Sequence, residues 1–210
     1  MSLLDYDALR ATPVAQDPFP HVVVPHFVPP TRLPSVVSAL PPLSKRGSFP
    51  VSGMTFGPAA QALMAEMEGD TLRHAIADKF GLDLSEAPTM LTLRAWTTER
   101  DGQIHCDSRA KRVTVLLYLN PADETWARHE GCLRLLRGPR DLEHYAVEVP
   151  PVNGTLLVFP NSAQAWHGHK VFTGQRYSLQ LNYMTTDAKA RSELRRHRLS
   201  ALLKRLTPAA

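Results

Sequence analysis

The segment QRYSLQLNYM (residues 175–184) decides the fold class together with five earlier segments of the same character. Each is short and rich in Val, Leu, Tyr or Phe, and turn-favouring pairs such as Asn153-Gly154 and Thr173-Gly174 separate them, which is typical of strands. The other five are TMLTLRAW (89–96), RVTVLLYLN (112–120), GCLRLLR (131–137), EHYAVEVP (143–150) and GTLLVFP (154–160). At least six strands in sequence predict a β-sandwich or barrel as the main body of the protein.

The chain before residue 89 favours helices instead. HVVVPHFV (21–28) is strand-like, but TRLPSVVSAL (31–40) predicts a short helix. Residues 57–81 have helical apolar spacing, with Pro58 suited to a first turn, Gly81 to a C-terminal stop, and Gly69 to a break between two helices. Helices followed by strands define the α+β class.

A length of 210 residues favours one domain with a substantial core. Within it we expect three parts. Residues 1–88 would supply an N-terminal strand and buttressing helices, residues 89–186 the β core, and residues 187–210 a basic C-terminal helix.

The C-terminal helix explains the charge of the chain. Residues 189–206 contain seven Lys and Arg against one acidic residue, a charge of +6, so the rest of the chain carries about −2 of the net charge of +4. Asp187 can cap this helix, and an apolar stripe is offered by Leu194, Leu199, Leu202, Leu203 and Leu206. We expect the helix to pack on the domain with its basic face in solvent; docking to a polyanion or a partner is the alternative.

Composition points to a cytoplasmic protein. No apolar run approaches the ~20 residues that a membrane span needs. The first residues, MSLLDYDALRATPVAQDP, do not resemble a secretory signal. Two cysteines, Cys106 and Cys132, are too few for a disulfide framework.

The stretch IHCDS (104–108) raises three alternatives: a metal-binding pair, a cysteine nucleophile, or an ordinary piece of strand. His105 and Asp107 are two positions apart, so on an extended segment both project to one face and can share a metal ion. Cys106 between them would point to the opposite face, without the adjacent base that a nucleophile needs. The pair requires a third ligand from elsewhere.

Residues 165–183, AWHGHKVFTGQRYSLQLNY, can supply that ligand as His167 or His169. Two histidines and one carboxylate on one side of an iron ion make a facial triad that leaves other positions open. Arg176 follows at the start of a strand, with Ser178 on the same face, so the two can jointly bind a carboxylate.

These residues resemble the iron(II)- and 2-oxoglutarate-dependent oxygenases of the prolyl-hydroxylase-like branch. The resemblance covers residues 89–184 and is carried by His105-x-Asp107, by RVTVLLYLN, GCLRLL and GTLLVFP, and by His167 nine residues before Arg176. It implies a double-stranded β-helix (jelly roll) with N-terminal supporting helices. It also implies that the protein is a dioxygenase that hydroxylates a C–H bond and converts 2-oxoglutarate to succinate and CO2.

The same resemblance assigns roles to individual residues. His105, Asp107 and His167 would hold Fe(II), since the spacing to Arg176 matches the family from His167 rather than from His169. Arg176 would bind the far carboxylate of 2-oxoglutarate with help from Tyr118, and Ser178 is a further candidate for that task. O2 is the remaining cosubstrate. The segment before His105 lacks the tyrosines that some prolyl hydroxylases have there and offers Arg94 and Trp96 instead.

We expect a small-molecule or peptidyl substrate and no membrane partner. Nucleic acid is not the expected partner, because the basic residues gather in one terminal segment; a homodimer through that segment is left open. The alternative function is a non-catalytic metal-binding or ligand-sensing jelly roll.

Overall fold

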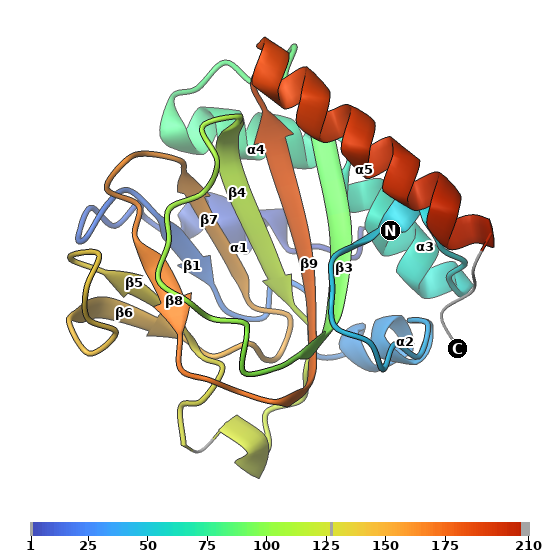
Figure 1. The fold of residues 1–210 in the computed structure, drawn as a ribbon, viewed down its shortest axis with the longest axis horizontal. Coiled ribbons are helices and arrows are strands. Elements are labelled where there is room, and N and C mark those ends of the chain that lie inside the picture. The colour runs from blue at the N-terminus through green and yellow to red at the C-terminus, as the bar shows by residue number, and fades with distance from the viewer. Residues whose placement is uncertain (1, 127, 207–210) are drawn as a thin grey trace.

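The fold is known from a computed structural model, which describes residues 2–126 and 128–206. Two antiparallel sheets form its body (Figure 1). One has six strands in the order β1-β7-β4-β9-β3-β2, and the other has three in the order β6-β5-β8. The strands are β1 (Val22–Val24), β2 (Phe49–Pro50), β3 (Thr89–Thr97), β4 (Lys111–Tyr118), β5 (Leu133–Leu136), β6 (Tyr145–Val149), β7 (Leu156–Pro160), β8 (His167–His169) and β9 (Gly174–Met184).

The two sheets face each other across a small apolar cluster. Leu116 of β4 and Phe159 of β7 pack there with Leu133 and Leu135 of β5. All six predicted strands are present, and two facing antiparallel sheets confirm the jelly-roll prediction. The sequence reading missed β2 and β8, which have only two and three residues.

Helices cover the other face of the six-stranded sheet, as Figure 1 shows. They are α1 (Tyr6–Ala11), α2 (Leu33–Ser38), α3 (Pro58–Met67) and α4 (Asp70–Phe80), with short 3-10 turns η1 (Val51–Gly53) and η2 (Glu124–Trp126) elsewhere. Gly69 separates α3 from α4, and Gly81 ends α4 in the left-handed conformation, both as predicted. Helix α1 was not predicted.

The side chains of β4 and β9 alternate between the two faces of the six-stranded sheet, one covered by the helices and one facing the small sheet. Val113, Val115 and Leu117 of β4 enter the large core beneath the helices, as do Leu179 and Leu181 of β9. Because side chains alternate along a strand, the residues between them face the small sheet. This second face carries the polar side chains described below.

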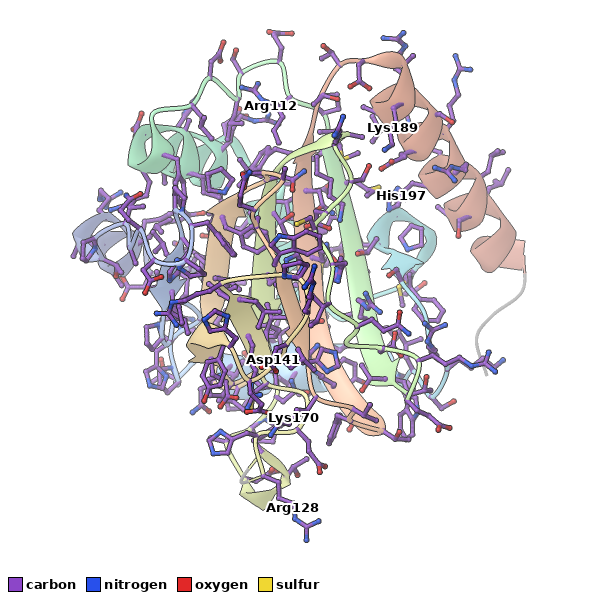
Figure 2. The ribbon with its side chains drawn as sticks, turned by 60° about the vertical axis from the view of Figure 1, so that its left-hand side comes forward. Arg112, Arg128, Asp141, Lys170, Lys189 and His197 are labelled. Carbon is purple, nitrogen blue, oxygen red and sulfur yellow. The ribbon has the colours of Figure 1, made fainter. Side chains whose placement is uncertain are left out.

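Helix α5 (Ala188–Leu206) crosses the molecule on the outside and contacts η1 and β2 (Figures 1 and 2). Asp187 accepts a hydrogen bond from the backbone N–H of Ala190 at 2.8 Å, so the predicted cap is confirmed. The predicted apolar stripe is wrong in part: Leu199 and Leu202 are 60% and 57% exposed, whereas Ala190 and Ala201 are buried. The side chains of Leu203 and Leu206 lie outside the described residues.

The buried residues of α5, Ala190 and Ala201, are small, and Leu194 packs beside Ala190. At Ala201 the helix approaches the body closely, since a Cβ atom on Gly53 would lie 2.7 Å from the backbone oxygen of Ala201. Among the helices that the structure describes, none combines the length and apolar character required to cross a membrane.

Candidate active site

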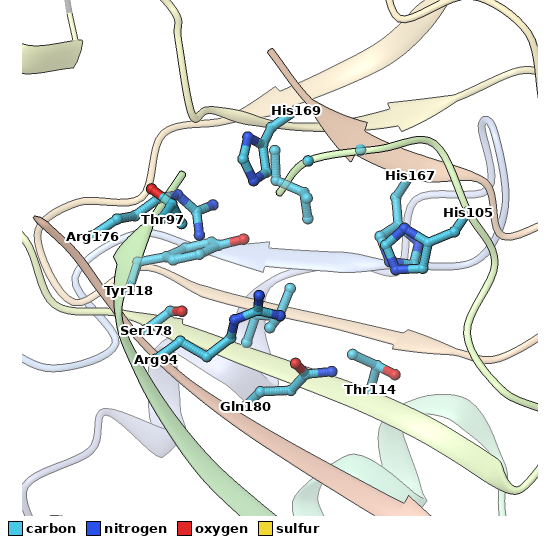
Figure 3. A pocket seen from close by; sticks show the side chains of 14 residues that line it. Arg94, Thr97, His105, Thr114, Tyr118, His167, His169, Arg176, Ser178 and Gln180 are labelled. Atoms are coloured by element: carbon cyan, nitrogen blue, oxygen red, sulfur yellow. The ribbon is translucent and has the colours of Figure 1, made fainter. Parts of the chain in front are cut away.

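A cavity of about 90 Å³ lies between the small sheet and the polar face of β3, β4 and β9 (Figure 3). We call it the inner cavity. It is lined by Arg94, Thr97, Gly102, His105, Thr114, Leu116, Tyr118, Leu133, His167, Gly168, His169, Arg176, Ser178 and Gln180. Arg176, Tyr118 and Ser178 stand at one end, and His105 and His167 at the other.

The structure brings His105, Asp107 and His167 together. Their ligand atoms lie within 4.8 Å of one another, and the two imidazole rings are 4.3 Å apart between centroids. Reciprocal backbone hydrogen bonds of 3.0 Å join His105 to His167, so a short bridge fixes the two positions. His169 is not part of this group.

The hydrogen bonds of both histidines suit metal binding. Nδ1 of His105 lies 2.8 Å from the backbone oxygen of Gln103, and Nδ1 of His167 lies 2.9 Å from that of Ala165. A carbonyl can only accept, so each Nδ1 carries the proton and each Nε2 keeps its lone pair for a ligand. Burial, with the neighbouring His105, lowers the pKa of His167 to about 4, which keeps this imidazole neutral near pH 7.

Asp107 is held as an anion. Its two carboxylate oxygens accept hydrogen bonds from the Lys111 ammonium and the Thr114 hydroxyl. Burial alone would raise the pKa of Asp107, but Lys111, His167 and these hydrogen bonds outweigh it and lower the pKa. A carboxylate has about four lone-pair sites, so it can still ligate a metal. Two imidazoles and a carboxylate are a donor set that fits Fe(II).

Cys106, between two members of this group, is half-buried and makes a 3.5 Å contact from Sγ to the backbone oxygen of Ala163. Burial and the charge of Asp107 raise the pKa of its thiol. A protonated thiol is a poor nucleophile, so the chemistry of this position weighs against the cysteine alternative.

At the opposite end, Arg176 is a buried cation with 6% exposure. Its Nε donates to the backbone oxygen of Gly131 at 2.9 Å, and its Cζ lies 5.2 Å from the centre of the Tyr118 ring. In the described part of the chain it forms no ion pair. A buried charge is costly unless an opposite charge meets it, so this end of the cavity is suited to an anion.

Tyr118 and Ser178 share this end of the cavity. The Tyr118 hydroxyl is buried and makes no hydrogen bond of acceptable geometry within residues 2–126 and 128–206. Burial raises the pKa of Tyr118 although Arg176 opposes the shift, so the hydroxyl keeps its proton and remains a donor. Arg176 and Tyr118 thus present donors to the same space.

His169 and Arg94 line the cavity between its two ends. Burial and the charge of Arg176 lower the pKa of His169 to about 4, so it is neutral as well. Arg94 pairs with Asp101 at 3.0 Å, which compensates the burial of its charge. It also lines the inner cavity.

The sequence reading missed three polar residues of the site. Thr114 and Gln180 line the inner cavity, and Lys111 pairs with Asp107. Alternation was the available signal for two of them: Thr114 has the same face as Tyr118, and Gln180 the same face as Arg176 and Ser178. Lys111 has no such signal, because its contact with Asp107 depends on the conformation of the loop between them.

A second group of possible metal ligands comprises His129, Cys132 and Glu148. There Glu148 is already paired with Arg134 at 2.6 Å, and burial raises the pKa of Cys132 to about 11. The raised pKa keeps the Cys132 thiol protonated, whereas a metal ligand is a thiolate, so this place favours a salt bridge over a metal ion.

Comparison with known proteins gives one family and a consistent fold. Residues 91–184 match the model of the 2OG-Fe(II) oxygenase superfamily. A search of curated proteins finds no match. Similar solved structures include a Pseudomonas putida prolyl-4-hydroxylase, with 20% identity and a TM-score of 0.56 over 86% of this chain and 91% of that one.

Two more solved structures have a similar fold. A prolyl 4-hydroxylase from Phytophthora capsici has 17% identity and a TM-score of 0.58, over 98% of this chain and 79% of that one. A Trichoplax adhaerens prolyl hydroxylase, solved in complex with a hypoxia inducible factor peptide fragment, has 19% identity and a TM-score of 0.52 over 90% and 91%. At these identities the likeness establishes the fold.

The chain therefore carries a domain of the 2OG-Fe(II) oxygenase superfamily, the dioxygenases that use Fe(II), 2-oxoglutarate and O2. Its fold is that of the prolyl hydroxylases. The predicted family, fold class, enzyme class and cofactors are confirmed, and nothing in the comparisons supports a non-catalytic jelly roll.

Proposed function

We propose that the protein hydroxylates a substrate C–H bond, with His105, Asp107 and His167 as the Fe(II) ligands. Arg176 binds the far carboxylate of 2-oxoglutarate, Tyr118 donates a hydrogen bond to it, and Ser178 lies beside them. The observation that carries the proposal is a buried arginine without an acidic partner in the described chain, placed across one cavity from two histidines whose Nε2 atoms are free to ligate.

Fe(II), 2-oxoglutarate and O2 together supply the oxidation: one oxygen atom enters the substrate as a hydroxyl group, and the other enters succinate as CO2 is lost. The residues of the chain bind and orient. Arg176 fixes one end of the dicarboxylate, so its other end points toward the histidines. Leu116 and Leu133 also line the inner cavity and present apolar surface that limits the access of water.

Further proposals concern the whole chain. Residues 1–88, 89–186 and 187–210 act as one oxygenase unit in the cytoplasm, where the free thiols of Cys106 and Cys132 would stay reduced. The Trichoplax neighbour, solved with a peptide, supports a peptidyl substrate as one class, and small molecules are the other. Nucleic acid has no role in this proposal, and a homodimer would form through α5.

The metal assignment can be tested with His167 and His169 as a matched pair of buried histidines. Anaerobic addition of Fe(II) and 2-oxoglutarate should give wild-type protein a weak visible charge-transfer band. His105→Ala, Asp107→Ala and His167→Ala should abolish the band, because each removes a ligand. His169→Ala should retain it. Loss of the band in His169→Ala but not in His167→Ala would reverse the assignment of the third ligand.

The role of Arg176 predicts a separate effect. Arg176→Ala should raise the 2-oxoglutarate concentration needed for half-saturation by roughly 100-fold, since truncating one member of a buried charge pair costs about 3 kcal/mol. Arg176→Lys should recover part of the loss. Metal binding without 2-oxoglutarate, measured by equilibrium dialysis, should be unchanged. An unaltered 2-oxoglutarate affinity in Arg176→Ala would contradict the assignment.

A further inference from the structure

A second, larger cavity of about 450 Å³ opens beside the metal-ligand group. We call it the outer cavity. It shares Arg94, His105 and Gln180 with the inner cavity and also reaches Asp107. Its remaining lining residues are Ser48, Pro50, Met90, Thr92, Lys111, Asn182, Glu193, Arg196, His197 and Ser200. The last four belong to α5, so this helix forms one wall of a space that begins at the metal ligands.

The lining of the outer cavity is mostly polar. Pro50 and Met90 are its apolar members, whereas Thr92, Gln180 and Asn182 present hydroxyl or amide groups from the floor of the sheet. Pockets for apolar ligands have mainly hydrophobic and aromatic linings. A ligand of this cavity must therefore be polar itself, which the side chain of proline is not.

The charge of the lining is positive. Arg94, Lys111 and Arg196 stand against Asp107 and Glu193. Glu193 accepts a hydrogen bond of 2.7 Å from the hydroxyl of Ser108 and pairs with none of the three cations. A divalent metal ion held by Asp107 would add two further positive charges at the inner edge of the cavity.

The three cations differ in how far they are neutralised. Lys111 pairs with Asp107. Arg94 shares a single carboxylate, that of Asp101, with Arg46, at 3.0 and 2.8 Å. Arg196 forms no ion pair in the part of the chain that the structure describes. It lines the outer cavity together with other residues of α5. Positive charge thus remains at both the inner and the outer end.

We propose that the outer cavity is the substrate site and that the substrate is a small polar molecule bearing a carboxylate or phosphate group. Arg196 binds this anionic group, and Arg94 supplies positive charge nearer the reacting carbon. The inference rests on the proposed function, because it takes the metal-ligand group as the reacting centre. It selects small anions over a prolyl peptide as the substrate class.

The test measures succinate formed from 2-oxoglutarate under air, with two small-molecule fractions of a cell extract as probes. We expect the fraction retained by an anion exchanger to stimulate succinate formation and the unretained fraction to have no effect. Treatment with alkaline phosphatase separates the two sources of charge: a phosphate ester loses its effect, and a carboxylate keeps it. Stimulation only by the unretained fraction, or only by a capped prolyl peptide without charge, would overturn the proposal.

Adjacent arginines of α5 provide the matched variants. Arg196→Gln should raise the KM for the active anionic fraction by roughly fivefold, the effect of losing one partly exposed ion pair. Arg195→Gln removes the same charge from an exposed position that does not line the cavity, and its KM should be unchanged. Equal KM values in the two variants would overturn the role of Arg196.

The charge-transfer band distinguishes a failure of this inference from a failure of the proposed function. A wild-type protein that forms the band with Fe(II) and 2-oxoglutarate, yet responds to no anionic fraction, refutes the substrate class alone. A wild-type protein that forms no band refutes the proposed function on which the inference rests.

Discussion

At the scale of single residues, the inner cavity contains one buried polar atom that the described chain leaves without a hydrogen-bond partner, the hydroxyl oxygen of Tyr118. Burying a hydroxyl without a hydrogen bond costs free energy, so such atoms are rare unless a ligand completes them. Tyr118 and Tyr183 both have buried hydroxyl groups without partners in the described chain. Tyr118 faces the inner cavity, and Tyr183 belongs to the core beneath the helices.

This pair allows a matched experiment. Tyr118→Phe should lower the affinity for 2-oxoglutarate about tenfold, the effect of losing one hydrogen bond to a charged group. It should leave the melting temperature unchanged or slightly higher, because no bond is lost in the free protein. Tyr183→Phe should likewise leave the melting temperature unchanged or slightly higher, and it should leave the affinity for 2-oxoglutarate unaltered. Equal cosubstrate affinities in both variants would remove Tyr118 from the site.

Asp101 predicts a pH dependence of stability. Burial alone would raise its pKa, but hydrogen bonds from Arg46 and the Thr98 backbone and the charge of Arg94 lower it below the ordinary value. A lowered pKa in the folded state stabilises the protein above the unfolded-state pKa of about 3.9, and this contribution is lost as the pH falls toward the folded-state value.

Urea unfolding should therefore show that Asp101→Asn lowers the free energy of unfolding by about 3 kcal/mol near neutral pH. The difference from the wild type should become smaller in acid. Asp7→Asn is the control, since Asp7 pairs with Arg10 in solvent and its side chain is 91% exposed. An exposed pair contributes little, so this variant should unfold like the wild type. A loss in Asp101→Asn that is independent of pH would mean that its charge is not what stabilises the fold.

At the scale of elements, the attachment of α5 depends on Gly53. Any side chain there meets the backbone of Ala201, which cannot move aside as a flexible side chain would. Gly53→Ala should displace α5, lower the free energy of unfolding by about 1–3 kcal/mol, and reduce amide-exchange protection in residues 188–202. Gly138→Ala, where a Cβ meets nothing within 4 Å, should change neither quantity. Unaltered protection of α5 in Gly53→Ala would show that the contact is not required.

The elements also show what the sequence could predict. The six longer strands and the α3–α4 break follow from local patterns in apolar residues, prolines and glycines, so they were found. The apolar stripe of α5 was wrong at Leu199 and Leu202, because leucines usually face the core, whereas here the helix backbone approaches Gly53 closely at Ala201. Strand β8 was missed because three residues containing Gly168 carry no pattern, although they include two histidines of the inner cavity.

At the scale of the whole molecule, the candidate site joins residues that are distant in sequence. His105 and His167 are brought together by a single two-residue bridge, and Arg176 comes from a strand of the opposite sheet. Residue types and spacing indicated this group only through resemblance to a family. The outer cavity could not be predicted in the same way, because it exists only where α5 lies across the sheet.

The position of α5 gives the two proposed sites different places along the chain. The proposed metal ligands and Arg176 lie on loops and strands within residues 105–176, while Arg196 and its neighbours on the outer wall belong to one terminal helix. With the proposed assignments, substitutions in that helix would alter which molecule is oxidised without disturbing how oxygen is activated. A lineage of such proteins would then acquire new substrates by varying a single surface segment, with its inherited chemistry left intact.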